Sequence, residues 1–139
     1  MSTIKLSQLR FSDLPLAEAL QKAIADAGFD YCTPIQAASL PLSLAGKDIA
    51  GQAQTGTGKT AAFLVTVLQH CLQNPRKSAH GVRAFILAPT RELAIQIHRD
   101  ALLLSKYCQL KMALIYGGLG YNAQKQSLTP DVDILIGTP

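Results

Sequence analysis

Residues Gln52–Thr60 read QAQTGTGKT, and this stretch decides the fold. The apolar run before it predicts a strand over residues 48–53, and the run after it predicts a helix over Lys59–Gln73. A glycine-rich turn between a strand and a helix is the context that a phosphate-binding loop requires. Gly56 and Gly58 let successive N–H groups curl toward phosphate oxygens, and the helix N-terminus adds the positive end of its dipole.

The Lys-Thr pair at the end of this loop carries the chemistry. Lys59 supplies an ammonium group for the β- and γ-phosphates of a nucleotide, and the Thr60 hydroxyl can ligate Mg²⁺. The first position of the usual pattern G-x-x-x-x-G-K-S/T is Ala53 rather than Gly. Alone, the loop predicts nucleotide-phosphate binding and leaves the reaction open, because kinases, GTPases, transporter ATPases and helicases share it.

After the loop, short apolar strands alternate with longer helical stretches. Strands are predicted over residues 83–88, 111–116 and 132–136, and helical elements over residues 59–73, 91–106 and 121–128. This rhythm predicts an α/β fold with a parallel sheet. The strand sequences AFILA and DILI are continuously apolar, as expected when helices cover both faces of the sheet.

The first 46 residues predict two helices instead. One spans residues 15–27, between Pro15 and Gly28, and the second runs from Thr33-Pro34 toward Gly46 with a break expected around Pro41. We therefore expect an N-terminal helical segment over residues 1–46 and an α/β unit over residues 47–139. Residues 74–80, NPRKSAH, are expected to form a solvated loop.

Composition fits one globular domain or part of one. The chain has 139 residues, of which 48% are apolar and 16% charged, so it is too hydrophobic for a disordered protein. The net charge of +4 permits a polyanionic partner but supports nucleic-acid binding only weakly. Three cysteines without a C-x-x-C pair favour buried thiols over disulfides or a zinc site. The histidines show no ligand spacing, and none is expected to be catalytic: His70, His80 and His98.

Targeting and membrane-spanning segments are not predicted. The first residues contain no apolar stretch of signal-peptide length, and the apolar run over residues 61–68 is too short to cross a bilayer. We therefore expect a soluble, cytoplasmic protein.

Five short motifs occur in order along the chain. They are Gly28-Phe29 with Thr33-Pro34-Ile35-Gln36, AQTGTGKT at 53–60, PTRELA at 89–94, Gly117-Gly118, and Thr138-Pro139. These motifs resemble the Q motif, motif I, motif Ia, the GG element and the opening of motif Ib of DEAD-box RNA helicases, whose motif I also begins with Ala. Within that family, residues 32–60 and the sequence DILIGTP at 133–139 look most similar to the bacterial RhlB type.

The resemblance implies a RecA-like P-loop fold, with helices on both faces of a parallel sheet, that binds ATP and Mg²⁺. Gln36 would read the adenine edge, because its amide both donates and accepts, and Phe11 would stack on the base. The implied ATP-binding residues are Phe11, Phe29, Thr33, Gln36, Ala53, Gln54, Thr55, Gly56, Thr57, Gly58, Lys59 and Thr60. Thr60 would also ligate the Mg²⁺ ion that accompanies the nucleotide. The structural alternatives are an ordinary packing role for Phe11 and an exposed polar role for Gln36.

The resemblance also implies a site for the RNA backbone, formed by Pro89, Thr90, Arg91, Gly117, Gly118, Thr138 and Pro139. Thr90 and Arg91 begin a helix after a strand, so free N–H groups, a hydroxyl and a guanidinium converge where a phosphate can sit. Simple helix capping by Thr90 and a plain turn at Gly117-Gly118 are the structural alternatives. These sites follow the carboxyl ends of predicted strands, where ligands bind in open α/β sheets. Binding without base readout and with marked salt dependence is expected.

The Asp-Glu-Ala-Asp sequence that names the family does not occur in the 139 residues. The available carboxylates are poorly placed to replace it, because Asp48, Asp131 and Asp133 precede predicted strands and Glu92 lies in the motif Ia helix. We therefore assign no catalytic residue. We expect a RecA-like domain truncated before the family's DEAD motif, which binds ATP and RNA but does not hydrolyse ATP.

The resemblance implies that the intact family member is an RNA-dependent ATPase that unwinds short duplexes. The RhlB type implies a role in RNA turnover and a partner complex for RNA degradation that includes an endoribonuclease. The main alternative is a non-catalytic module that binds adenine nucleotide or RNA. A metabolite kinase or transporter ATPase would leave Gln36, the PTRELA segment and Gly117-Gly118 unexplained.

Overall fold

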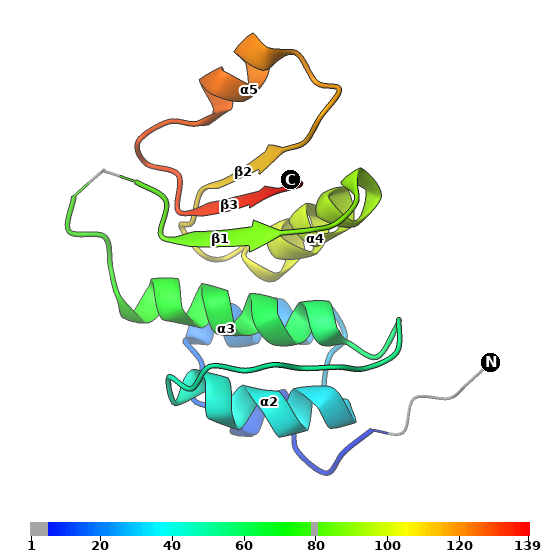
Figure 1. The fold of residues 1–139 in the computed structure, drawn as a ribbon. Helices are drawn as coiled ribbons and strands as arrows, with labels where there is room; N and C mark the ends of the chain where they lie inside the picture. Colours follow the sequence, from blue (N-terminus) through cyan, green and yellow to red (C-terminus); the bar gives the residue numbers. More distant parts are fainter. Residues whose placement is uncertain (1–5, 79–80) are drawn as a thin grey trace.

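The computed structural model describes residues 6–78 and 81–139. Its elements are the short 3-10 helix η1 (Phe11–Asp13), α1 (Glu18–Asp26), α2 (Pro34–Leu44), α3 (Lys59–Gln73), β1 (Ala84–Leu87), α4 (Arg91–Leu104), β2 (Met112–Ile115), α5 (Tyr121–Ser127) and β3 (Ile134–Gly137). The helical N-terminal part and α3 lie on one side of the molecule, and the strands lie beyond α3 (Figure 1). His80 and the end of the predicted loop 74–80 lie outside the described residues.

The three strands form a parallel sheet in the order β1-β3-β2, which confirms the predicted α/β class. Helix α4 connects β1 to β2, which lies on the far side of β3, and α5 connects β2 back to β3. Right-handed crossovers in opposite directions place α4 and α5 on opposite faces of the sheet. On β1, however, Phe85 and Leu87 are 61% and 56% exposed, while Ile86 between them is buried. β1 is an edge strand, and one of its faces has no helix over it in the described chain.

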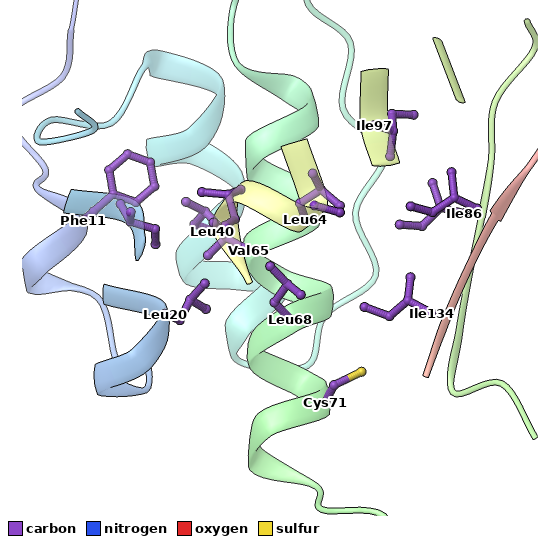
Figure 2. Close-up of a cluster of buried hydrophobic side chains, with 14 of the residues drawn as sticks. Phe11, Leu20, Leu40, Leu64, Val65, Leu68, Cys71, Ile86, Ile97 and Ile134 are labelled. Atoms are coloured by element: carbon purple, nitrogen blue, oxygen red, sulfur yellow. The ribbon is translucent and has the colours of Figure 1, made fainter. Parts of the chain in front are cut away.

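Helix α3 occupies the centre of the core. Figure 2 shows its side chains Leu64, Val65 and Leu68 between apolar residues of the N-terminal helices and those of the sheet and α4. These three residues are at most 1% exposed, and burial of such side chains contributes about 1.5–3 kcal/mol each. The predicted helix over residues 59–73 is therefore confirmed, and its packing fixes the position of Lys59 at its first turn.

The strand predicted over residues 48–53 is wrong. Residues 48–52 are exposed, and in the described chain no backbone-to-backbone hydrogen bond involves residues 48–57. The segment runs beside α2, where the backbone of Gly51 approaches Ile35 (Figure 1). A strand requires a neighbour with which to exchange ladder hydrogen bonds, and the edge strand β1 does not lie beside this segment.

The interior of α2 and the start of α1 also differ from the prediction. Helix α2 continues through Pro41, where a break was expected, because the packing of α2 on α3 outweighs the missing N–H donor. The Ser43 and Thr66 hydroxyls join the two helices at 2.7 Å, while Pro41 faces solvent. Helix α1 begins at Glu18, not at residue 15, because Ala17 has a ψ of 146°, outside the helical region, and its N–H donates to Gln69 Oε1 of α3 at 2.7 Å.

The amino-terminal edge of the sheet is held together by one buried carboxylate. Asp133 lies 2.9 Å from the guanidinium groups of both Arg76 and Arg83, and it accepts a 2.9 Å hydrogen bond from the Lys111 N–H. Burial alone would raise the pKa of Asp133, but the Lys111 hydrogen bond and the two arginines outweigh it and hold this pKa below its ordinary value. Arg76 therefore ties its part of the predicted solvated loop to the sheet.

The cysteines are free thiols, as predicted. Cys32 and Cys71 are buried and Cys108 is half-buried, and burial raises the pKa of all three thiols. Within residues 6–78 and 81–139, no helix has the length and apolar character needed to cross a membrane.

Candidate nucleotide and RNA sites

The phosphate loop precedes α3 directly, and glycine makes its conformation possible. Gly56 and Gly58 have φ angles of +81° and +88°, a left-handed region that residues with a Cβ rarely adopt. Gly58 caps α3, so the first N–H groups of that helix are free to meet an anion. The ammonium of Lys59 donates to the Ala53 carbonyl across the loop. The predicted glycine turn and the helix after it are therefore present, although no strand leads into the turn, and phosphate binding there stays a prediction.

The Q motif is in direct contact with this loop. At the start of α2 one half of a capping box is present, in which the Thr33 N–H donates to Gln36 Oε1 at 2.9 Å. Gln36 Nε2 donates to the Gly58 carbonyl at 3.1 Å, although the two residues are 22 positions apart. Gln36 is only 2% exposed, so the alternative of an exposed polar residue is wrong. Oε1 of this amide can accept a second hydrogen bond and Nε2 can donate a second one, so both atoms are able to pair with a base.

One buried hydroxyl at the contact between the Q motif and the phosphate loop is available to a bound nucleotide. Thr33 Oγ1 is the buried side-chain oxygen that lacks a hydrogen-bond partner among the described residues. A buried unpaired hydroxyl costs about 1–3 kcal/mol unless something bonds to it. A Cβ at Gly58 would collide with the Gln36 amide and crowd this hydroxyl. The Gln36 amide and the unpaired Thr33 Oγ1 therefore both lie beside Gly58, where the loop leads into α3.

The two predicted aromatic residues lie side by side with different exposure. The Phe11 and Phe29 rings are 5.9 Å apart between centroids. Phe11 is 2% exposed and belongs to the core, whereas Phe29 is 40% exposed. The packing role considered for Phe11 is therefore present, and stacking of Phe11 on a base stays a prediction.

Three of the predicted RNA-binding segments meet in one shallow hollow of about 510 Å³. It is lined by Pro89, Thr90, Arg91, Glu92, Gly117, Thr138 and Pro139. These residues follow β1, β2 and β3, and parallel strands bring their carboxyl ends to the same edge of a sheet. Residues almost 50 positions apart thereby form one surface, as the sequence predicted.

Arg91 links the motif Ia segment to the GG element. Its Nη1 donates to the Gly117 carbonyl at 3.4 Å, and a Cβ at Gly118, whose φ is +93°, would lie 2.9 Å from this nitrogen. Thr90 Oγ1 accepts a 3.2 Å hydrogen bond from the Leu93 N–H, so the expected helix cap is present. The hydroxyl proton of Thr90 is still available to a phosphate, so capping and RNA contact are compatible.

Sequence analysis missed two residues at these sites. Gln124 fastens α5 to the loop, because its Oε1 accepts from the Tyr116 N–H at 3.1 Å and its Nε2 donates to the Leu119 carbonyl at 3.3 Å. Glu92 lines the hollow and brings a negative charge to it. Gln124 lies in none of the five motifs, whereas Glu92 belongs to the PTRELA segment and was expected in that helix but not as part of the RNA site.

Thr60 is the residue that the sequence predicts as a ligand of Mg²⁺. In the parts of the chain that the structure describes, no three His, Cys, Asp or Glu residues gather as they would around a metal ion. Asp133 sits in its ion-pair cluster at the edge of the sheet opposite the hollow, as its place before β3 predicted. His70 is exposed, and burial lowers the pKa of His98.

Comparisons with known proteins show the family of this chain. Residues 33–139 match the DEAD/DEAH box helicase family. The ATP-dependent RNA helicase RhlB of Pasteurella multocida is 62% identical over 96% of this chain and 32% of its own length, and that of Shewanella sp. (strain ANA-3) is 55% identical over 99% and 32%. The chain thus spans about a third of the length of the curated relatives it matches.

A solved structure supports the fold. The crystal structure of a DEAD box protein from Methanococcus jannaschii superposes with a TM-score of 0.84 at 38% identity, over 94% of this chain and 34% of that one. The parallel sheet with its helices is therefore RecA-like. Since the family match covers residues 33–139, which include the phosphate loop, the Q-motif glutamine and the hollow, the chain belongs to the DEAD/DEAH box helicase family, and it is similar to members named RhlB.

Proposed function

We propose that this chain binds ATP at the phosphate loop and the RNA backbone at the hollow, as part of an ATP-dependent RNA helicase. The observation that carries the proposal is the hollow itself, in which the segments after three parallel strands converge on Arg91 and Gly117. The Gln36–Gly58 hydrogen bond supports the nucleotide half, because it joins a base-reading amide to a phosphate loop. The names of the relatives, ATP-dependent RNA helicases, agree with both halves.

The nucleotide site would use a small set of groups. Lys59 would meet the β- and γ-phosphates together with the N–H groups of Thr57, Gly58 and the first turn of α3. Thr60 would hold Mg²⁺ on the nucleotide, where the ion neutralises phosphate charge. Gln36 and Thr33 would face the base, and the exposed Phe29 ring lies near them in sequence.

Gln36→Ala should reduce discrimination between ATP and GTP more than it reduces binding of the phosphates, because only the base-reading amide is removed. The ratio of the two dissociation constants, measured by titration, checks this expectation. Gln73→Ala, at an exposed position at the end of α3, is the matched control and should leave the ratio unchanged. An unaltered ratio in Gln36→Ala would show that Gln36 does not read the base.

Arg91→Ala should weaken binding to unrelated single-stranded RNA sequences to a similar degree. It should also reduce the slope of log affinity against log salt by about 0.7, the value for one phosphate contact on a single strand. Fluorescence anisotropy at several salt concentrations measures both quantities. Arg99→Ala, exposed two turns further along α4, serves as control. A loss confined to one RNA sequence would indicate base readout and contradict the backbone model.

We also propose that residues 1–139 bind but do not hydrolyse ATP. Phosphoryl transfer requires a carboxylate that holds Mg²⁺, an oriented water and positive charge at the γ-phosphate. Lys59 would supply the charge and Thr60 a hydroxyl ligand for Mg²⁺, but we assign no residue of this chain to the carboxylate or to the orientation of the water. Phosphate release from the purified chain with ATP, Mg²⁺ and RNA should equal that of Lys59→Ala. RNA-stimulated release that Lys59→Ala abolishes would mean that a residue of this chain supplies the missing base.

Unwinding of short duplexes, a role in RNA turnover and association with an RNA-degradation complex containing an endoribonuclease belong to the same proposal. The support is the 55–62% identity to proteins named RhlB. A cytoplasmic location and a division of the chain at residue 47 stay predictions. The apolar core includes residues from both sides of that division, from Phe11 to Ile136.

A further inference from the structure

The short helix α5 presents an aromatic side chain to solvent next to the hollow. Tyr121, its first residue, is 76% exposed, the largest exposed fraction among the large apolar and aromatic residues that the structure describes. None of the residues of α5 is buried. Within the described chain, the Tyr121 hydroxyl makes no hydrogen bond. Packing within the described chain therefore does not explain an aromatic residue here.

The position of Tyr121 is fixed rather than loose. Gln124, three residues on, bonds to the backbone of both Tyr116 and Leu119 and so holds α5 against the end of β2. Gly117, which lines the hollow and accepts from Arg91, precedes Tyr121 by four residues. Four residues span at most about 14 Å, so the Cα atom of Tyr121 lies within that distance of Gly117, close enough for one RNA strand to reach both.

The segment that carries the ring is open, and α5 itself contains no acidic residue. A Cβ added at Gly117 or Gly120 would meet no atom within 4 Å, so the loop before Tyr121 leaves room for a polymer strand. Lys125 is exposed and lies four residues after Tyr121, on the same face of α5. The sequence of α5, YNAQKQS, contains no acidic residue.

We propose that Tyr121 stacks on an unpaired base of an RNA strand whose phosphates occupy the hollow, with Lys125 beside a neighbouring phosphate. The inference rests on the proposed RNA-binding function and extends it from backbone contact to base stacking. An aromatic platform next to a basic track is the arrangement that binds single strands, and it tolerates any sequence because every base has a π-face. Stacking here is therefore compatible with the absence of base readout at the hollow.

The test compares two probes that carry the same phosphates, a ten-nucleotide oligouridine and its abasic counterpart, on the full-length protein. Tyr121→Ala should bind the oligouridine about tenfold more weakly and the abasic probe as the unaltered protein does. Tyr121→Phe retains the ring and should bind both probes normally. Since Tyr121 is exposed, both variants should keep their circular dichroism spectrum and ATP affinity. In Tyr121→Trp, oligouridine should quench the indole fluorescence and the abasic probe should not.

Two results would overturn the inference. An unchanged affinity of Tyr121→Ala for oligouridine would show that no base stacks on the ring, and an equal loss on both probes would show that Tyr121 acts on the backbone. Arg91→Ala on the same probes separates this inference from the proposed function. If Arg91→Ala weakens binding and Tyr121→Ala does not, the stacking inference alone fails; if neither variant has an effect, the RNA site at the hollow fails as well.

Discussion

Lys59→Ala should weaken ATP binding roughly 10- to 150-fold in the full-length protein, which corresponds to about 1.5–3 kcal/mol for a charge-assisted contact. The ammonium group reaches across the phosphate loop to the Ala53 carbonyl and lies at the start of α3, where free N–H groups converge. An anion placed there would meet the lysine and the helix N-terminus together. Isothermal titration with ATP measures the change.

The control for this variant is Lys47→Ala, which removes an exposed lysine twelve positions upstream. It should leave the affinity for ATP unaltered. If Lys59→Ala also binds ATP with unchanged affinity, the stretch Gln52–Thr60 does not hold phosphates, and the assignment of the nucleotide site is wrong.

Asp133→Asn should lower the free energy of unfolding by about 3 kcal/mol at neutral pH, because it leaves two arginines near a buried position without their carboxylate. The side chain of Asp133 is 8% exposed and joins the residues before β1 and β2 to β3. Urea unfolding followed by circular dichroism measures the effect. Asp131→Asn, two residues away and exposed, is the matched control and should have little effect, since solvent screens its pair with Lys111.

The contribution of Asp133 should also depend on pH. Its pKa in the folded protein lies below that in the unfolded chain, so the folded state favours the charged form. The stabilisation is therefore complete above the unfolded pKa, about 3.9, and is lost as pH falls through the lower folded pKa. The stability difference between the unaltered protein and Asp133→Asn should shrink on acidification from pH 6 to pH 3. A constant difference would contradict the ion-pair account.

The local sequence determined the phosphate loop and the helix that follows it. Two glycines with positive φ and a run of apolar residues after Lys59 are short-range signals, so the bounds of α3 were predicted correctly. The order of strands and helices was likewise readable from apolar runs. Because parallel strands share one carboxyl edge, that order also predicted that the segments around Arg91, Gly117 and Thr138 would meet.

Features that depend on a distant partner were decided only by the tertiary structure. Residues 48–53 have the composition of a strand but no neighbour to pair with in the described chain, and Pro41 is tolerated inside α2 because α2 packs on α3. The hydrogen bond from Gln36 to Gly58 and the convergence of Arg76 and Arg83 on Asp133 join residues 22 to 57 positions apart. Apolar periodicity and turn chemistry act over a few residues, whereas hydrogen bonds and ion pairs between distant segments require the packed core that brings their partners within reach.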